Sequence, residues 1–528
     1  MMSHDSNYPM STIVRPGLLL SAALYLGGAA AQINYVATEI AWDDREFDVS
    51  YGLEDINGDG RQDLILPHWQ RTLGRELWIY EQLGDGRFSD TPRRIEIKTE
   101  IVAVGFADLR PEPGKELVLF AGPGLFTLST AIEGYAGNLQ PLVQWQLAAD
   151  VPAFDTVELI RELNDIDGDG LTDLLLPGPR SWGYFRGDGT GGMTLSTEFT
   201  TLNPDLDPAL QGDRDRDLST NLTIDAQTGI RLEVSARRPS PFADLVQTWQ
   251  ADQSAADGTL LEAENWMPAV QLADLDGDGR EDMVYLNTDT DLQAQLNLHR
   301  QRPDGSFPPE PDWHHSVTGR GNLRITDLDG DAFTDLVRLE GSGDQWDAFL
   351  FRNRNGSFDL AQPDQVMRFS GYDATLSFID IDGDGRPELN VSYYTIPVVE
   401  AIRNTAILRT QLLYSADGAE AGQLFSRRPL SRLEESFSAT NVRGLAEQMS
   451  LRWDVDGDGR KDALYITEAG AVAARRIDTQ LRIEEQPFWT YVPDRSVIGF
   501  FVRDLNGDDV PDLVLRHGTS ITLLVARP

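Results

Sequence analysis

The chain has 528 residues, 41% of them apolar, and this composition excludes a wholly disordered protein because it supplies enough apolar side chains for a core. Its 85 acidic and 45 basic side chains give a formal net charge of −40, which argues against nucleic acid as a partner, since phosphate binding requires an excess of Lys and Arg. The absence of cysteine excludes disulfide bonds and thiolate zinc sites.

The N-terminus has the pattern of an export signal. An apolar stretch over residues 18–26 follows a basic residue, and small residues precede a cleavage site at Gln32. We therefore expect residues 1–31 to be a signal peptide and residues 32–528 to form a single secreted or periplasmic domain of a bacterial cell envelope. A membrane anchor is the alternative, although the run is short for a span. After cleavage we expect no membrane span.

A nine-residue acidic pattern, Asp-x-Asp/Asn-Gly-Asp-x-x-x-Asp/Glu, occurs seven times, starting at Asp55, Asp165, Asp274, Asp327, Asp380, Asp454 and Asp504. Successive starts are 110, 109, 53, 53, 74 and 50 residues apart. Midway through the first interval, residues 107–118 keep the same frame, but Arg110 takes the place of an acid and could replace a cation by pairing with Asp108 or Glu116. The repeat of about 53 residues is in the range of propeller blades and not of helical repeats.

Each repeat reads as short strands joined by turns. In the unit that starts at Asp327, strand-like runs cover residues 322–326, 336–339 and 348–352, and Asn355-Gly356 marks a tight turn. The distance from the first loop acid to the Phe of this turn is 33, 33 and 31 residues in the three units that keep both landmarks. The repeat is therefore structural, with about four short strands in each unit.

A single four-stranded sheet cannot bury both of its faces, whereas sheets stacked around an axis can. We therefore predict an all-β protein, a β-propeller of four-stranded blades. Eight blades are counted when residues 107–118 are included, and seven remain possible under another grouping. The last unit lacks a fourth strand, so we expect the N-terminal strand at about residues 33–40 to pair with it and close the ring.

Two stretches interrupt the period. Residues 200–262 contain Pro-rich and Asp-rich segments without an intact acidic loop, and we interpret them as an insertion or as a blade without a metal loop. Residues 390–450 lengthen another unit and include a strand-like run at 406–414.

The acidic pattern predicts a metal site. Side-chain oxygens at positions 1, 3, 5 and 9, with a backbone carbonyl at position 7, follow the first half of an EF-hand loop, and the glycines permit the sharp wrap. Oxygen ligands without His or Cys favour calcium over zinc or copper. Positions 10–12 are strand-like, so an EF-hand is excluded. We predict about seven structural Ca2+ sites, with ligands from Asp55, Asn57, Asp59, Arg61, Asp63, Asp165, Asp167, Asp169, Leu171, Asp173, Asp274, Asp276, Asp278, Arg280, Asp282, Asp327, Asp329, Asp331, Phe333, Asp335, Asp380, Asp382, Asp384, Arg386, Glu388, Asp454, Asp456, Asp458, Arg460, Asp462, Asp504, Asn506, Asp508, Val510 and Asp512.

These loops, set in β-units of 50–60 residues, resemble the FG-GAP/VCBS-type repeat of the integrin α-subunit propeller and of many exported bacterial proteins. The resemblance covers about residues 40–528. It implies that the matched Asp and Asn positions of the seven loops ligate calcium between adjacent strands of a blade. It says little about function.

The sequence contains no Gly-x-Ser-x-Gly elbow, phosphate-binding glycine loop or His-Glu-x-x-His motif. We therefore expect a non-catalytic binding or adhesion scaffold for a protein or carbohydrate, without catalytic residues. The alternative is a polysaccharide lyase or hydrolase on the same fold, for which His68 and the pair His314–His315 are weak candidates. A structural envelope component is a third possibility. A cleft that joins a His or Tyr to an Arg would favour the enzyme, and a flat aromatic or acidic rim would favour the binder.

Overall fold

The structure is a computed structural model that describes residues 34–41, 51–70, 73–128, 135, 137–147, 157–160, 163–178, 181–199, 230–237, 246–254, 260–266, 270–288, 293–318, 322–342, 344–395, 406–417, 419–438, 449–508 and 510–527. Within these residues there is no helix long and apolar enough to cross a membrane. The predicted signal peptide, residues 1–31, lies outside them.

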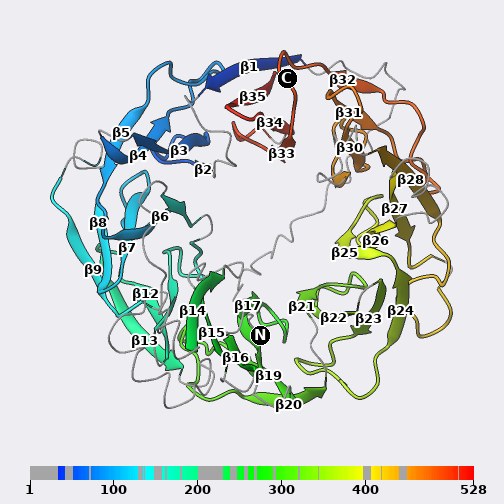
Figure 1. Cartoon of the computed structure of the whole chain (residues 1–528), viewed down its shortest axis with the longest axis horizontal. Helices are drawn as coiled ribbons and strands as arrows, with labels where there is room; N and C mark the ends of the chain where they lie inside the picture. The colour runs from blue at the N-terminus through cyan, green and yellow to red at the C-terminus, as the bar shows by residue number, and fades with distance from the viewer. Residues whose placement is uncertain are drawn as a thin grey trace, which may run out of the picture.

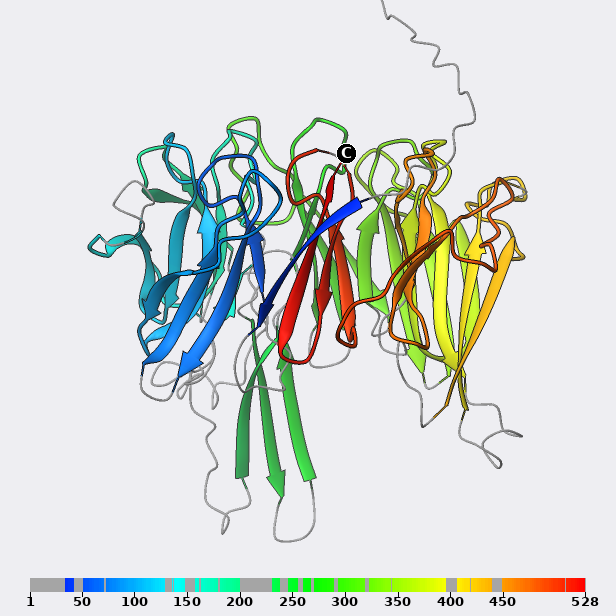
Figure 2. The same cartoon turned by 90° about the horizontal axis from the view of Figure 1, so that it is seen from above.

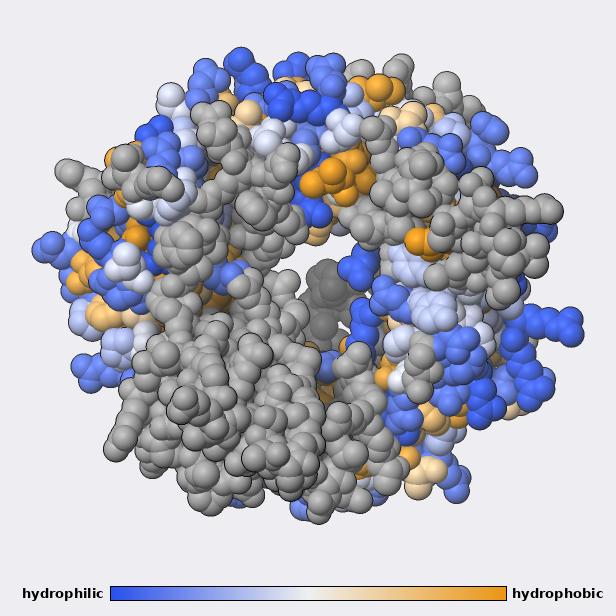
Figure 3. Space-filling view, in the orientation of Figure 1, coloured by the Kyte–Doolittle hydropathy of each residue, from blue (hydrophilic) through white to orange (hydrophobic). Residues whose placement is uncertain are grey.

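The described strands form a ring of eight blade sheets around a central opening (Figures 1 and 3), which confirms the predicted β-propeller and its higher blade count. The first four blades in chain order contain β2 (Gly52–Glu54), β3 (Asp63–Gln70), β4 (Gly74–Tyr80) and β5 (Arg93–Ile97); β6 (Ile101–Ala107), β7 (Glu116–Ala121), β8 (Gly124–Leu128) and β9 (Gln140–Gln144); β11 (Leu174–Pro177), β12 (Trp182–Gly187) and β13 (Met193–Phe199); and β17 (Val270–Ala273), β18 (Asp282–Thr288), β19 (Gln293–His299) and β20 (Trp313–Thr318).

The remaining blades are also antiparallel sheets of consecutive strands, apart from the closing strand of the last one. They contain β21 (Asn322–Thr326), β22 (Asp335–Ser342), β23 (Gln345–Phe351) and β24 (Gln365–Ser370); β25 (Tyr372–Ile379), β26 (Glu388–Thr395), β27 (Ala406–Tyr414) and β28 (Ser431–Ser438); β29 (Ser450–Trp453), β30 (Asp462–Ile466), β31 (Val472–Arg475) and β32 (Trp489–Tyr491); and β33 (Gly499–Arg503), β34 (Asp512–Arg516), β35 (Ser520–Arg527) and β1 (Asn34–Ala41). The strand expected at 406–414 is β27.

The ring closes as the sequence predicts. Strand β1 pairs antiparallel with β35 over its whole length, from Asn34 opposite Arg527 to Ala41 opposite Ser520. The first and last described segments of the chain therefore share one blade (Figures 1 and 2). Opening the ring would separate this entire strand pair, so closure is cooperative with folding.

One blade departs from the four-stranded pattern. Strand β10 (Glu158–Leu159) precedes β11 in the chain but pairs in parallel with β6 of the preceding blade, so the sheet β11–β13 has three strands. The segment that contains β10 therefore ties two neighbouring blades together by backbone hydrogen bonds.

A ninth sheet is separate from the eight blades. It contains β14 (Ile230–Arg237), β15 (Val246–Ser254) and β16 (Leu260–Trp266) in consecutive antiparallel order. Figure 2 shows it projecting from one face of the ring. These strands account for the described part of the stretch 200–262, and the rest of that stretch lies outside the described residues.

The core lies between the blades. The apolar run that follows each acidic loop forms the second strand of a blade, and neighbouring sheets cover both of its faces. In β3, for example, Leu64, Ile65 and Leu66 are all at most 3% exposed. Leu64 and Leu66 pack in a cluster with Val514 and Leu523 of the closing blade. Strands buried on both faces read as continuous apolar runs, which is the pattern that follows the loops in the sequence.

Candidate metal centres in the acidic loops

Each acidic loop joins the inner strand region of its blade to the second strand, so all of them lie on the same face of the ring. The β14–β16 sheet leaves the ring between the outer strand β13 and the inner strand β17, at the opposite ends of the strands, and it projects from the other face (Figure 2). The ring thus presents one face formed by acidic loops, and the two faces differ in chemistry.

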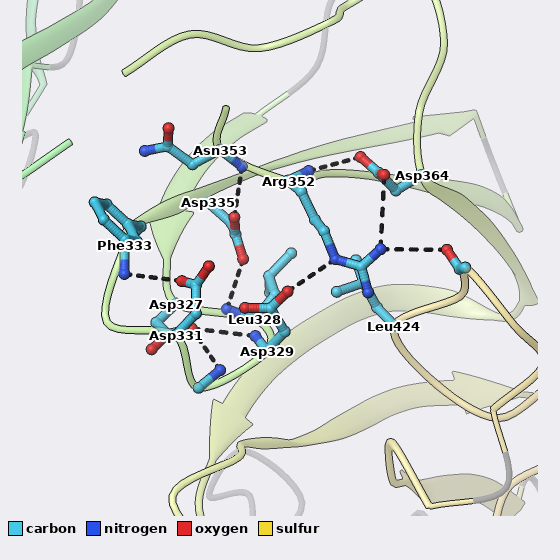
Figure 4. Close-up of polar contacts among 12 residues, drawn as sticks. Asp327, Leu328, Asp329, Asp331, Phe333, Asp335, Arg352, Asn353, Asp364 and Leu424 are labelled. Carbon is cyan, nitrogen blue, oxygen red and sulfur yellow. Dashed lines mark hydrogen bonds and ion pairs between the residues drawn. The ribbon is translucent and has the colours of Figure 1, made fainter. Parts of the chain in front are cut away.

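The acid at position 1 folds the loop back on itself. In the loop that starts at Asp327, its Oδ1 accepts the N–H of Gly330 at 2.8 Å and its Oδ2 accepts the N–H of Ala332 at 3.1 Å (Figure 4). The same two positions donate to Asp55, Asp165, Asp274, Asp380 and Asp454. A side-chain acceptor that satisfies several successive backbone donors explains why the loop folds from local sequence.

The acid at position 9 is the buried end of the loop, between 0 and 3% exposed in all seven copies. In the loop at Asp327, Asp335 accepts the N–H of Leu328 at 2.9 Å and the N–H of Asn353 at 2.7 Å (Figure 4). Burial raises the pKa of Asp335 to about 7, and these two backbone donors oppose the rise. Burial also raises the pKa of the other six, to about 6 or 7: Asp63, Asp173, Asp282, Glu388, Asp462 and Asp512.

The acid at position 5 is more exposed and accepts the N–H of position 7. Asp331 accepts from Phe333 at 2.9 Å (Figure 4). The pKa of Asp331 is raised by burial and then by its neighbours Asp329 and Asp327. A carboxylate whose pKa is raised by two others lies in a cluster of negative charge, which is unfavourable unless a cation or protons offset it.

In two loops the acid at position 3 has one partnered and one unpartnered oxygen. In Asp456, Oδ2 accepts from Arg476 Nε at 2.7 Å, whereas Oδ1 is buried without a hydrogen-bond partner and the side chain is 5% exposed. Asp329 Oδ2 likewise accepts from Arg352 Nε at 2.8 Å, and its Oδ1 is also unpartnered (Figure 4). The Oδ1 atoms of Asp276 and Asp382 share this condition.

A buried carboxylate oxygen without a donor is costly, and here it recurs at one position of a repeat. In five loops, ligand atoms of three acids lie within 4.8 Å of one another: Asp165, Asp167 and Asp173; Asp274, Asp276 and Asp278; Asp327, Asp329 and Asp335; Asp380, Asp382 and Glu388; and Asp454, Asp456 and Asp462. The residues therefore fit a cation with oxygen ligands. The backbone carbonyl expected at position 7 stays a prediction.

The loops at Asp55 and Asp504 have an Asn at position 3, which leaves one acid fewer to gather. In the second of these, the Asn506 amide donates to Asp508 Oδ2 at 3.0 Å. Their position-9 acids, Asp63 and Asp512, keep the bond to the N–H of position 2. These two loops thus share the fold of the other five but differ in charge at one ligand position.

Residues 108–116 keep the position-9 hydrogen bond of the frame without the acid cluster, and Pro111 and Pro113 replace the N–H donors of positions 4 and 6. Glu116 Oε2 accepts the N–H of Leu109 at 3.0 Å, as the position-9 acids do elsewhere. The Arg110 guanidinium lies against Gly191 in the next blade. Its predicted pairing with Asp108 or Glu116 stays a prediction.

Some neighbouring loops are joined by a backbone hydrogen bond. The N–H at position 8 of one loop donates to the carbonyl at position 2 of the preceding loop, as from Lys461 to Ile381 at 2.8 Å. The same bond joins Gln62 in the first loop to Leu505 in the last, at 2.7 Å. The loops at Asp380 and Asp504 cannot donate this bond, because position 8 is Pro387 and Pro511. The acidic loops thus form a belt on this face of the ring, and these bonds connect some of its neighbouring loops.

Comparison with protein families gives a match at this belt. A family model described as the FG-GAP-like repeat matches residues 274–338 and 327–391, and each match spans two acidic loops with the strands between them. Residues 274–391 thus carry FG-GAP-like repeats. No curated protein matches the chain.

Two solved structures are similar to this chain. The first is described as the structure of the Dos1 propeller, with 11% identity and a TM-score of 0.34 over 81% of this chain and 93% of that chain. The second is Sqt1 from Saccharomyces cerevisiae, with 10% identity and a TM-score of 0.31 over 81% of this chain and 96% of that chain.

Sequence reasoning did not find the arginines that contact the position-3 acids. Arg352 and Arg476 immediately follow the third strands β23 and β31, 23 and 20 residues after the acids that they contact. One signal was available in the sequence, since an Arg also lies near the end of the third strand in the units at Asp165 and Asp274, as Arg186 and Arg300.

The described histidines have structural environments. His299 is fully buried in the pair with Tyr285, and burial lowers its pKa. His517 is buried between Ser496 and Thr522. His68 stacks on Trp78 with ring centroids 3.7 Å apart.

His314 and His315 lie on the outer strand β20, away from the opening. A cavity of about 300 Å3 beside β24 is lined partly by Tyr414, Arg368 and Arg427. Burial raises the pKa of Tyr414 to about 12, which keeps its phenol protonated near neutral pH. A protonated phenol of this kind is a poor general base.

Proposed function

We propose that this protein is an exported, calcium-binding β-propeller that serves as a non-catalytic scaffold for a protein or carbohydrate ligand. The observation that carries the calcium assignment is the unpartnered, buried oxygen at position 3, exemplified by Asp456 Oδ1, within a cluster of acids. Such an oxygen is expensive to bury unless a cation coordinates it.

The donor set supports calcium over other metals. All candidate ligands are oxygens, which excludes a preference for zinc or copper. Each loop is short and wrapped by its own hydrogen bonds, and it offers several carboxylates, as calcium sites do. A bound ion would offset the mutual repulsion of the acids. Outside the cytosol, calcium concentrations are high enough to fill sites of modest affinity, which agrees with the export signal predicted for residues 1–31.

The test of the calcium assignment is a count of bound metal. We expect purified protein dialysed against millimolar Ca2+ and then desalted to retain several ions per chain by mass spectrometry of the metal content, with magnesium substituting poorly. Isothermal titration of protein stripped with EDTA should show heat on addition of Ca2+. Two results together would contradict the assignment. The purified protein would carry no metal, and the stripped protein would show no heat when Ca2+ is added.

The scaffold assignment is supported by the shape and chemistry of the ring. One face carries the belt of acidic loops. The rim of the opening carries hydrophilic residues and an apolar patch beside β33 (Figure 3), and Ile498 and Phe501 near that strand are 53% and 46% exposed. Exposed apolar groups beside polar ones are suited to protein or carbohydrate contact. A screen against a glycan and surface-protein array in calcium would identify the ligand, and degradation of a polysaccharide by the purified chain would favour the enzymatic alternative.

A further inference from the structure

In four blades an arginine at one fixed place contacts the acid at position 3. We propose that Arg186, Arg300, Arg352 and Arg476 are built-in counter-charges that set the calcium affinity of their own loops. This inference rests on the calcium sites proposed above. It assigns a role to residues that lie outside the nine-residue pattern and that are not themselves ligands.

The place is defined by the register of the blade. In β22 and β23, Leu336 pairs with Phe351, and the next residue, Arg352, reaches Asp329. In β30 and β31, Ala463 pairs with Arg475, and the next residue, Arg476, reaches Asp456. Arg186 forms an ion pair with Asp167, and Arg300 Nε lies 3.8 Å from Asp276 Oδ2. All four position-3 residues in these blades are Asp.

The two loops with Asn at position 3 have no arginine at this place. The residue whose N–H binds the position-9 acid marks the register, and it is Gln82 for Asp63 and Ala526 for Asp512. The residues just before these are Glu81 and Val525. Four of the five loops with Asp at position 3 have this Arg, and both loops with Asn lack it. An Asp–Arg pair and a neutral Asn carry the same net charge at position 3, so in both kinds of loop the remaining carboxylates come from positions 1, 5 and 9. Among these, Asp59 and Asp278 form ion pairs with the arginine at position 7 of their own loops.

The loop at Asp380 is the exception and shows what the arginine does. Leu389 pairs with Tyr414, so Ser415 occupies the place of the arginine. The closest cation to Asp382 among the ion pairs of the described residues is Arg460 of the next loop, at 4.0 Å. This loop keeps nearly four uncompensated carboxylates, and calcium affinity rises with the charge of the ligands. We therefore expect it to be the tightest of the sites.

The contact geometry favours a charge role over a ligand role. Arg476 and Arg352 each take one oxygen of their acid, as Arg476 takes Asp456 Oδ2, and leave the other oxygen unpartnered. A guanidinium cannot be a calcium ligand, because it has only donors. Its positive charge lies within a few ångströms of the site and opposes cation binding by Coulomb repulsion, while it stabilises the loop when no ion is bound.

The experiment is a double-mutant cycle on Asp456 and Arg476 in the full chain. Hydrogen exchange of the peptide that contains residues 454–462 is followed through a Ca2+ titration. The midpoint is the Ca2+ concentration at which half of the change in exchange has occurred, and it reports this one site. R476Q should lower the midpoint about tenfold, since an opposing charge is removed. D456N should raise it by about tenfold or more, because Arg476 then stands unopposed at the site. The double variant D456N/R476Q reproduces the Asn-type loop and should return to within about threefold of the unaltered protein.

Melting in EDTA supplies the second measurement. R476Q should melt at a lower temperature than the unaltered protein in EDTA. In Ca2+ the difference between the two melting temperatures should be smaller, because the ion replaces the lost counter-charge. The peptide that contains residues 55–63 belongs to a natural Asn-type loop and serves as the internal control, with an unchanged midpoint in all variants.

The outcomes separate this inference from the calcium assignment. If no loop peptide responds to Ca2+, both are overturned. If the loops respond but R476Q raises the midpoint, the arginine acts by positioning the acid and the counter-charge role is overturned alone. If the effects of the two single substitutions on the Ca2+ midpoint do not depend on each other, the charge pairing is likewise overturned.

Discussion

The loops at 327–335 and 108–116 share one anchoring hydrogen bond but differ in the acids that they gather. In both, the position-9 acid accepts the N–H of position 2, from Leu328 to Asp335 at 2.9 Å and from Leu109 to Glu116 at 3.0 Å. The first gathers three acids within 4.8 Å, whereas the second has an arginine at position 3. The anchor of the loop is thus a hydrogen bond from a backbone N–H to the position-9 acid, and position 3 decides whether an acid cluster forms.

Removal of the cation should produce the largest difference between the seven acidic loops and residues 108–116. We expect EDTA to lower the melting temperature by about 10 °C or more, since several ions that bind only the folded chain each add stability. Hydrogen exchange should rise at the seven acidic loops and least at residues 108–116. An unchanged melting curve in EDTA would refute this expectation, and a titration with excess Ca2+ that restores the curve is the control.

Truncation of the position-9 acid should destabilise both loops in EDTA, but it should reduce the response to Ca2+ only in the loop at 327–335. D335A and E116A should each lower the free energy of unfolding in EDTA by about 2 kcal/mol, because each leaves a buried N–H donor without its acceptor. Only D335A should also reduce the additional stability that Ca2+ provides. Chemical denaturation with and without Ca2+ measures both effects, and an equal calcium response in the two variants would show that Asp335 is not a ligand.

The pH dependence should reverse with calcium. The pKa of Asp335 and of Asp462 is raised by burial from 3.8 to about 7, so between these values the folded chain binds more protons than the unfolded chain. Stability of the metal-free protein should therefore fall as pH rises through this window. Melting in EDTA should occur a few degrees higher at pH 6 than at pH 8.

In Ca2+ the order of these two melting temperatures should be the opposite, because protons compete with the ion for the same carboxylates. Parallel melting curves at pH 6 and pH 8 under both conditions would show that the position-9 acids do not titrate in this window.

The smallest expected effect concerns a strained residue in one loop. Ala332 occupies position 6 with φ of 69°, where five other loops have Gly. A332G should raise the free energy of unfolding by about 0.5–1 kcal/mol by relieving this conformation. The matched control is G385A, at a position with φ of 85° where an added Cβ would meet no atom within 4 Å, and this variant should lose a similar amount. Chemical denaturation measures both changes, and a loss of stability in A332G would mean that the methyl group makes contacts that outweigh the strain.

Much of the fold could be predicted because its signals are local. The acidic nonapeptide contains the acceptors and the glycines that wrap it, as Asp327, Gly330 and Asp335 show. The apolar run after each loop reports a strand buried on both faces, and the missing fourth strand of the last unit predicted the pairing of β1 with β35. The parallel pairing of β10 with β6 could not be predicted, because it depends on how two blades meet.

The sequence by itself determined the repeat, the ring and the nine-residue frame of each loop, because these follow from hydrogen bonds and apolar patterns within a few residues. Only the tertiary structure decided which oxygens remain unpartnered, since this depends on where Arg352 and Arg476 arrive from the third strand of their blades. Only it joined Gln62 to Leu505 across the closure of the ring. Contacts between distant segments depend on the register of every strand between them. A local sequence pattern does not specify all of these registers together.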